Sequence, residues 1–172
     1  TWLDAEALEA DGPAARDEGP RLSDMATDLI ARADTLFIAS AAPNAGSDAA
    51  HGADVSHRGG KPGFVRVERS DTGTVLTVPD FRGNFFFNTL GNIAAYPRAG
   101  LLFIDFESGD LLTLTGTGEI VWDGPEVASF AGAERLLRLR IEGGRFIRNA
   151  LPLRWSGLEY APQLARTGTW SG

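Results

Sequence analysis

Apolar and polar positions alternate through much of the chain and predict a protein built mainly of short β-strands. The clearest strand is Leu111–Val121, in which leucine, isoleucine and glycine share one face and threonine shares the other. The same reasoning predicts strands at 35–41, 54–58, 63–69, 74–79, 99–106 and 135–142, and Gly143-Gly144 is expected to end the last of them with a turn. Such a series favours a closed or nearly closed antiparallel barrel, because closure removes exposed edges. A two-sheet sandwich is the alternative.

Two short helices are expected among these strands. Ser23 fits an N-cap, and the residues that follow as far as Ala33 place their apolar side chains on one face, which should pack on a sheet. The apolar period changes again over 84–96, where a second helix is predicted to end at Pro97. The fold class is therefore mainly β, with a few short α-helices.

The size and composition of the chain predict one folded domain. Its 172 residues, 43% of them hydrophobic, are enough to fill one core. Residues 1–20 have no sustained apolar period and are expected to form an N-terminal arm. The domain is expected at 21–155, followed by a C-terminal tail at 156–172 that folds across the domain or across a neighbouring subunit.

Charge and composition exclude several classes of function. A net charge of −7 argues against binding to nucleic acid or to anionic lipid, because both attract clustered Lys and Arg. The chain has no cysteine, which rules out disulfides and thiolate metal sites within it, and no metal site is expected. It also has no apolar run long enough to span a bilayer, and its acidic N-terminus lacks the basic region of a signal peptide. A cytoplasmic protein with small-molecule or protein partners is expected.

Two segments carry candidate cofactor chemistry. Residues 56–63, SHRGGKPG, combine hydroxyl, imidazole and cationic groups with three glycines, which let backbone N–H groups approach a flat or anionic ligand. Residues 79–84, PDFRGN, lead directly into the second predicted helix, whose N-terminus could bind a phosphate. Each segment also has a simpler interpretation, the first as a basic turn and the second as a loop in which Asn84 is only an N-cap.

The order of the two segments resembles a known family. GADVSHRGGKPGFVRV followed by LTVPDFRGNFFFNTLGNIAAYPRAGLLFIDFESGDLLTLTGTGEIV is closely similar to the pyridoxamine 5′-phosphate oxidase-like, FMN-binding split-barrel family. The similarity covers about residues 23–155 and is most specific between 52 and 121. It implies an antiparallel split β-barrel, FMN as the cofactor, and a homodimer in which both subunits contribute to each cofactor site.

The resemblance also assigns residues to the site. The residues that it implies around the isoalloxazine and ribityl parts of FMN are Ser56, His57, Arg58, Gly60 and Lys61, and those that it implies around the phosphate and the adjoining helix are Arg82, Asn84, Asn88, Thr89 and Asn92. Flavin supplies the redox chemistry itself, so an oxidoreductase needs no dedicated acid or base. His57 could protonate or orient a substrate, or could only hydrogen-bond the cofactor; no other catalytic residue is indicated.

The resemblance does not fix the reaction. The tail SGLEYAPQLARTGTW does not clearly reproduce the basic residues with which true pyridoxamine phosphate oxidases bind the substrate phosphate. The chain is more similar to members of the family that occur alone or fused ahead of flavin and iron–sulfur reductase modules. We therefore expect an FMN-dependent oxidoreductase that takes a small-molecule substrate or electron donor. The alternatives are a module that binds haem, with His51 or His57 as axial ligand, or a deazaflavin, and a non-catalytic flavin-binding or interaction domain.

Overall fold

The structure is a computed structural model that describes residues 4–7, 14–43, 52–81 and 88–170. Strands and short helices alternate along these ranges. The strands are β1 (Asp4–Ala7), β2 (Ala14–Glu18), β3 (Thr35–Ala41), β4 (Ala53–Gly59), β5 (Arg66–Ser70), β6 (Gly73–Phe81), β7 (Arg98–Ile104), β8 (Leu111–Val121), β9 (Ala133–Arg148) and β10 (Leu153–Ser156). The helices are α1 (Asp24–Arg32), α2 (Asn88–Ala95), α3 (Pro125–Ala128) and the 3₁₀ helix η1 (Pro162–Arg166).

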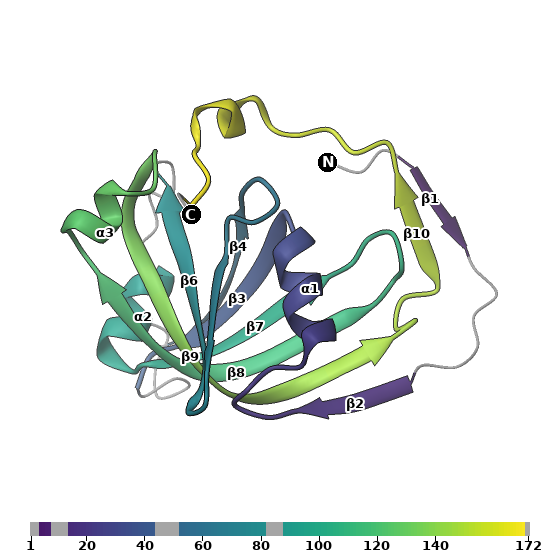
Figure 1. Ribbon diagram of the computed structural model, residues 1–172, viewed down its shortest axis with the longest axis horizontal. Coiled ribbons are helices and arrows are strands. Elements are labelled where there is room, and N and C mark those ends of the chain that lie inside the picture. The colour runs from purple at the N-terminus through teal and green to yellow at the C-terminus, as the bar shows by residue number, and fades with distance from the viewer. Residues whose placement is uncertain (1–3, 8–13, 44–51, 82–87, 171–172) are drawn as a thin grey trace.

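One antiparallel sheet of eight strands curls into a split barrel (Figure 1). Its hydrogen-bonded order is β4-β3-β7-β8-β9-β6-β5, and β2 pairs with β9 beside this path. Strands β4 and β5 are thus the two ends of the ladder, and the barrel is open between them in the part of the chain that the structure describes. This is the split-barrel architecture expected from the sequence, and the sandwich alternative is set aside.

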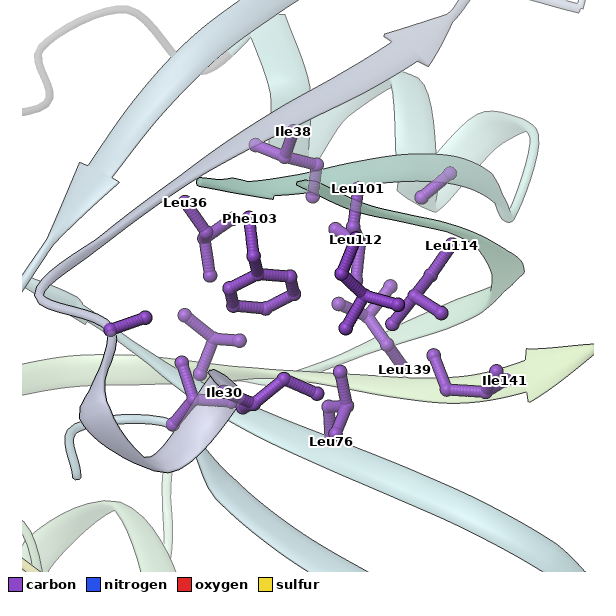
Figure 2. Packing of buried hydrophobic residues seen from close by; sticks show 14 of the residues in the cluster. Ile30, Leu36, Ile38, Leu76, Leu101, Phe103, Leu112, Leu114, Leu139 and Ile141 are labelled. Carbon is purple, nitrogen blue, oxygen red and sulfur yellow. The ribbon is translucent and has the colours of Figure 1, made fainter. Parts of the chain in front are cut away.

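The barrel interior is filled by leucine, isoleucine and phenylalanine side chains. Figure 2 shows Phe103 of β7 in the middle of this cluster, with Ile38 on one side and Ile30 of helix α1 on the other. All three side chains are fully buried. Helix α1 therefore completes the core by covering part of the barrel that the strands leave open.

Helix α1 begins as the sequence predicts, and a buried carboxylate reinforces its start. The Ser23 hydroxyl accepts a hydrogen bond from the N–H of Ala26, which satisfies one of the free donors of the first turn. The Glu18 carboxylate, at the end of β2, accepts hydrogen bonds from both the N–H and the hydroxyl of Ser23. Glu18 is buried, so the end of the N-terminal arm takes part in holding the first helix.

Strand β9 differs from the prediction. The sequence placed a turn at Gly143-Gly144, but β9 continues through both glycines to Arg148. Strands β8 and β9 approach too closely there for a side chain: a Cβ on Gly144 would lie 2.1 Å from the carbonyl oxygen of Thr113. The ladder also shifts register beside this point, between Thr115 and Gly116 of β8. These glycines permit a bulge in two tightly packed strands rather than a chain reversal.

The other differences lie in the terminal segments and in one hairpin. Strands β1 and β2 lie within the arm at 1–20, where the absence of an apolar period predicted no regular element; β1 pairs with β10, and β2 pairs with β9. Strand β5 begins at Arg66 rather than at residue 63, because Gly63 has a φ of 83° and belongs to the preceding turn. Strands β1 and β2 are therefore defined by backbone hydrogen bonds to other strands. The periodicity of side chains gives no information about such pairing.

No helix among the described residues has the length and apolar character needed to cross a membrane.

Candidate functional site

Strand β4 carries the first predicted motif and presents it on two faces. Because side chains alternate along a strand, Ser56 and Arg58 share one face and His57 lies on the other. Helix α2 packs beside β3 and β4 on the Ser56 side. The motif therefore does not surround a single point: its hydroxyl and guanidinium groups face one way and its imidazole faces the opposite way.

The first motif and the helix that follows the second motif meet through a chain of hydroxyl groups. The Ser56 and Thr89 hydroxyl oxygens lie 2.7 Å apart, and the Thr89 hydroxyl donates to the Asp54 carboxylate at 2.6 Å. Because threonine has one hydroxyl hydrogen and gives it to Asp54, the hydrogen between the hydroxyls must come from Ser56. The chain runs from Ser56 through Thr89 to Asp54, and only 1% of Thr89 is exposed.

A second contact extends this polar cluster along helix α2. The Asn92 side-chain amide donates to the Ser40 hydroxyl at 3.3 Å, and Ser40 is directly opposite Asp54 in the β3–β4 ladder. The structure thus places Ser56, Thr89 and Asn92 close to one another, and the sequence analysis assigns all three to the cofactor site. Asp54 and Ser40 are members that the sequence analysis missed. Asp54 is two positions before Ser56 on the same face of a predicted strand, a signal that could have identified it.

Arg58 has an internal partner. Its guanidinium donates to the Asp80 carboxylate at 2.8 Å, and both side chains are more than 90% buried. Asp80 also lies 3.2 Å from Nε of Arg135 on β9. The carboxylate of the second motif therefore holds the cation of the first, inside the barrel and next to the split between β4 and β5.

Lys61 and Gly60 also make contacts within the chain. The Lys61 ammonium donates to the carbonyl oxygen of Thr167 at 2.9 Å, so the C-terminal tail crosses the loop after β4. A Cβ on Gly60 would lie 2.3 Å from Cγ of Phe64, a buried core side chain. Packing of the loop explains why a glycine is needed at position 60, and a close approach by a ligand is not required to explain it.

His57 lies on the outward face of β4. Its Nε2 is 2.7 Å from the Thr35 hydroxyl, and its ring packs at a tilt against Phe37 with 5.7 Å between centroids. Gly59 allows this position, because a Cβ there would lie 3.2 Å from Cε1 of the imidazole. The ring is exposed to solvent and oriented by its neighbours.

The second motif, residues 79–84, is described only as far as Phe81. Phe81 ends β6, and Asn88 begins α2 with an exposed side chain; Arg82 and Asn84, which the sequence assigns to the phosphate, lie outside the described residues. Thr89, in the first turn of α2, connects this helix to Ser56. Among the described residues, no group of three or more His, Asp or Glu side chains could hold a metal ion.

Comparison of the whole fold with solved structures gives several matches. A variant of HupZ from Group A Streptococcus matches with a TM-score of 0.52 and 14% identity, over 72% of this chain and 98% of that one. A candidate pyridoxamine 5′-phosphate oxidase from Lactobacillus delbrueckii matches with a TM-score of 0.53 and 15% identity, over 76% of this chain and 99% of that one. The chain has the pyridoxamine 5′-phosphate oxidase-like split-barrel fold.

The split-barrel assignment rests on structure, because sequence comparison finds no relative. No family model and no curated protein sequence matches the chain. At 14–15% identity, the structural matches establish the fold and leave the ligand and the reaction open.

Proposed function

We propose that this split barrel binds FMN along β4 and the start of α2, and that it acts as a flavin-dependent oxidoreductase. The observation that carries the proposal is the contact between Ser56 and Thr89, which joins the two segments that resemble the FMN-binding family. Flavin would supply the hydride or electron chemistry, and the chain would bind and orient it. The substrate is a small molecule or an electron donor.

The hydroxyl cluster suits the ribityl chain of FMN better than its phosphate. Because the Ser56 hydrogen points to Thr89, the Ser56 oxygen has lone pairs that can accept from a ribityl hydroxyl. The Asp54 carboxylate next to Thr89 would repel a phosphate dianion at that position. We therefore assign Ser56, Thr89 and Asp54 to the hydroxyl-rich part of the cofactor.

The phosphate would then lie nearer the start of α2. The N–H groups in the first turn of an α-helix have no partner within the helix and carry a partial positive charge, both of which favour an anion. Asp80 neutralises the charge of Arg58, and one N–H of the Lys61 ammonium is donated to the carbonyl oxygen of Thr167. Arg82 is the cation that the sequence supplies just before this helix.

A homodimer is part of the proposal. The outward face of β3 and β4 carries small and apolar side chains, among them Ala39 and the paired Val55, which is 69% exposed. Exposed apolar groups on a sheet face are typical of a surface that another chain covers. Association through this face would place a second subunit against the outward face of β4, on the side opposite to the hydroxyl cluster. Sedimentation equilibrium would measure it, with Val55→Glu as the variant that should shift the protein to monomer.

The deciding experiment is an absorbance spectrum of the purified protein, followed by chemical identification of the released chromophore. The proposal predicts a flavin spectrum, FMN as the released compound, and bleaching by a reducing donor. A Soret band that disappears in His51→Ala or His57→Ala would instead establish haem binding. A protein that takes up no flavin on reconstitution, with no flavin-dependent gain in melting temperature, would contradict the proposal.

Variants of the hydroxyl cluster test where FMN binds. Ser56→Ala should weaken FMN binding about fivefold, the effect of losing one hydrogen bond of about 1 kcal/mol. Arg82→Ala should weaken it further, because a charge-assisted contact is lost. Thr113→Val is the control, since its hydroxyl lies on exposed β8 and hydrogen-bonds to the carbonyl oxygen of Arg145. Equal affinity in all three variants would remove Ser56 and Arg82 from the site.

A further inference from the structure

A groove lies on the face of β4 opposite to the hydroxyl cluster. It has a volume of about 310 Å³ and is formed by the first residues of β3, the end of β4, Phe106 and the segment 158–164 of the C-terminal tail. This volume is at the lower end of the range for small-molecule pockets, roughly 300–1,000 Å³. His57 and Ser56 belong to opposite faces of one strand, so a ligand in the groove would not compete with one bound at the hydroxyl cluster.

Four rings line the groove. Phe37 and His57 form one wall, packed against each other, and Phe106 and Tyr160 contribute from two other segments of the chain. Tyr160 also lines a neighbouring cavity of about 260 Å³, as do Asp34 and Phe106. Rings from four separate segments provide flat apolar surfaces that favour a planar aromatic ligand.

The polar groups of the groove favour a positively charged ligand over a negatively charged one. Asp34 and Glu159 are lining residues, and no lysine or arginine is among the described residues that line the groove. Burial raises the pKa of the Asp34 carboxyl, while its own backbone N–H and the nearby His57 lower it. Burial together with the Asp34 charge also raises the pKa of the Tyr160 hydroxyl. Carboxylates and aromatic faces both attract a cation, and both repel an anion.

The imidazole adds a directional contact. Nε2 of His57 is next to the Thr35 hydroxyl, and its other ring nitrogen has no hydrogen-bond partner among the residues that the structure describes. Gly59 leaves room for the ring in this position. A ligand lying against Phe37 could therefore form a hydrogen bond to Nδ1 of an imidazole that is already held in place.

From these features we infer that the groove binds a planar aromatic cation, such as a protonated arylamine, between the Phe37–His57 wall and Tyr160. The ring system packs against the aromatic side chains, and the ammonium group lies near Asp34. This site is separate from the one proposed for FMN.

The test uses two probes that share one ring system and differ in charge. Isothermal titration calorimetry on the full-length chain would compare 2-naphthylmethylamine, which is cationic, with 2-naphthoate, which is anionic. The amine should bind saturably and at least tenfold more tightly than the carboxylate. Absence of saturable amine binding, or equal binding of the two probes, would overturn the inference. The flavin content of the same preparation is measured separately. If the protein binds no FMN, the comparison of the amine with the carboxylate still tests the groove.

The two tyrosines of the chain provide a matched pair of variants. Tyr160 is 49% exposed and lines the groove, whereas Tyr96 is 45% exposed and lies after helix α2. Tyr160→Ala should weaken binding of the amine at least fivefold, and Tyr96→Ala should change it less than twofold. Asp34→Asn should weaken binding of the amine and reduce the preference of the groove for the amine over naphthoate. Equal effects of Tyr160→Ala and Tyr96→Ala would overturn the assignment, with thermal unfolding confirming that each variant is folded.

Discussion

The guanidinium of Arg58 lies 2.8 Å from the carboxylate of Asp80, and this ion pair connects strands β4 and β6 across the split of the barrel. Each residue belongs to one of the two motifs that the sequence singles out. Strands β4 and β5 are the two ends of the ladder among the described residues, so hydrogen bonds of the sheet do not hold β4 to this side of the barrel. The buried pair does so instead, and it links the positions of the two motifs.

We expect Asp80→Leu to destabilise the protein more than Arg58→Met does. Removing the carboxylate leaves two cations, Arg58 and Arg135, next to each other near the barrel interior, whereas removing Arg58 leaves Asp80 with Arg135 nearby. Loss of one partner of a buried pair typically costs about 3–5 kcal/mol. Urea unfolding would measure the difference, and Arg58→Met/Asp80→Leu should be more stable than Asp80→Leu alone.

The control for this prediction is an exposed pair. Arg98 and Glu142 are 2.9 Å apart, but their side chains are 53% and 38% exposed. Arg98→Met should therefore cost about 1 kcal/mol or less. An equal loss of stability in Arg98→Met and Asp80→Leu would show that the buried pair has no special role in closing the barrel.

Gly144→Ala should destabilise the barrel strongly, although alanine is usually a mild replacement. The new Cβ would lie 2.1 Å from the Thr113 carbonyl oxygen, so β8 and β9 would have to separate. We expect a cost of about 2–4 kcal/mol, in the range for forced overpacking or a lost strand contact. Chemical unfolding at equilibrium measures it.

Gly91→Ala is the matched control for the glycine prediction. Gly91 lies within helix α2, and outside its own helix no atom of the described residues lies within 4 Å of the position that its Cβ would occupy. Alanine there should stabilise the protein by about 0.5–1 kcal/mol, because glycine weakens a helix. If Gly144→Ala were as harmless as Gly91→Ala, the close approach of β8 and β9 at Gly144 would be refuted.

Stability should fall in acid partly through Asp105. Burial of this carboxyl opposes its ionisation, but hydrogen bonds from Arg32 and from the N–H groups of Ser108 and Glu107 outweigh burial and lower its pKa. A carboxyl whose pKa is lower in the folded than in the unfolded protein contributes stability above its unfolded pKa. That contribution disappears as the pH falls through the folded pKa.

Asp105→Asn tests this linkage. An amide keeps an oxygen for the two backbone N–H groups but loses the charge that binds Arg32, so the variant should be less stable by about 1 kcal/mol at pH 7. The difference from the unmodified protein should shrink as the pH is lowered past the pKa of Asp105. Unfolding free energies across an acid pH series give the result, and a constant difference at every pH would contradict it.

The sequence predicts the strands better than it predicts their ends and connections. Leu111–Val121 and Thr35–Ala41 were predicted with their observed bounds, because each has a strong apolar face between polar turns. The prediction of a turn at Gly143-Gly144 was wrong, because glycine occurs where two backbones approach closely as readily as where the chain reverses direction. Local pattern does not distinguish the two, since the clashing atom belongs to Thr113, which precedes Gly144 by 31 positions in the chain.

The candidate site divides in a similar way. The motifs identified Ser56 and Thr89, whose hydroxyl groups are hydrogen-bonded to each other, and Asn92, which donates to Ser40 beside them. They could not show that Arg58 is buried against Asp80 or that Lys61 reaches the C-terminal tail. Residue type indicates that a cation is available, but only the fold shows which partner already holds it.

Trp170 packs the C-terminal tail against the barrel, and we expect Trp170→Ala to release the tail. The indole N–H donates to the Phe64 carbonyl oxygen at 2.8 Å, its ring lies 4.4 Å from the Arg66 guanidinium, and its edge contacts Phe130. Loss of this packing should cost about 2–4 kcal/mol and make 157–170 sensitive to protease. Lys61 should lose its contact with Thr167 at the same time.

Trp122, which is 57% exposed, is the control, and Trp122→Ala should change stability by less than about 0.5 kcal/mol. Limited proteolysis with mass spectrometry would locate the cuts; a tail that stays protected in Trp170→Ala would mean that other contacts hold it.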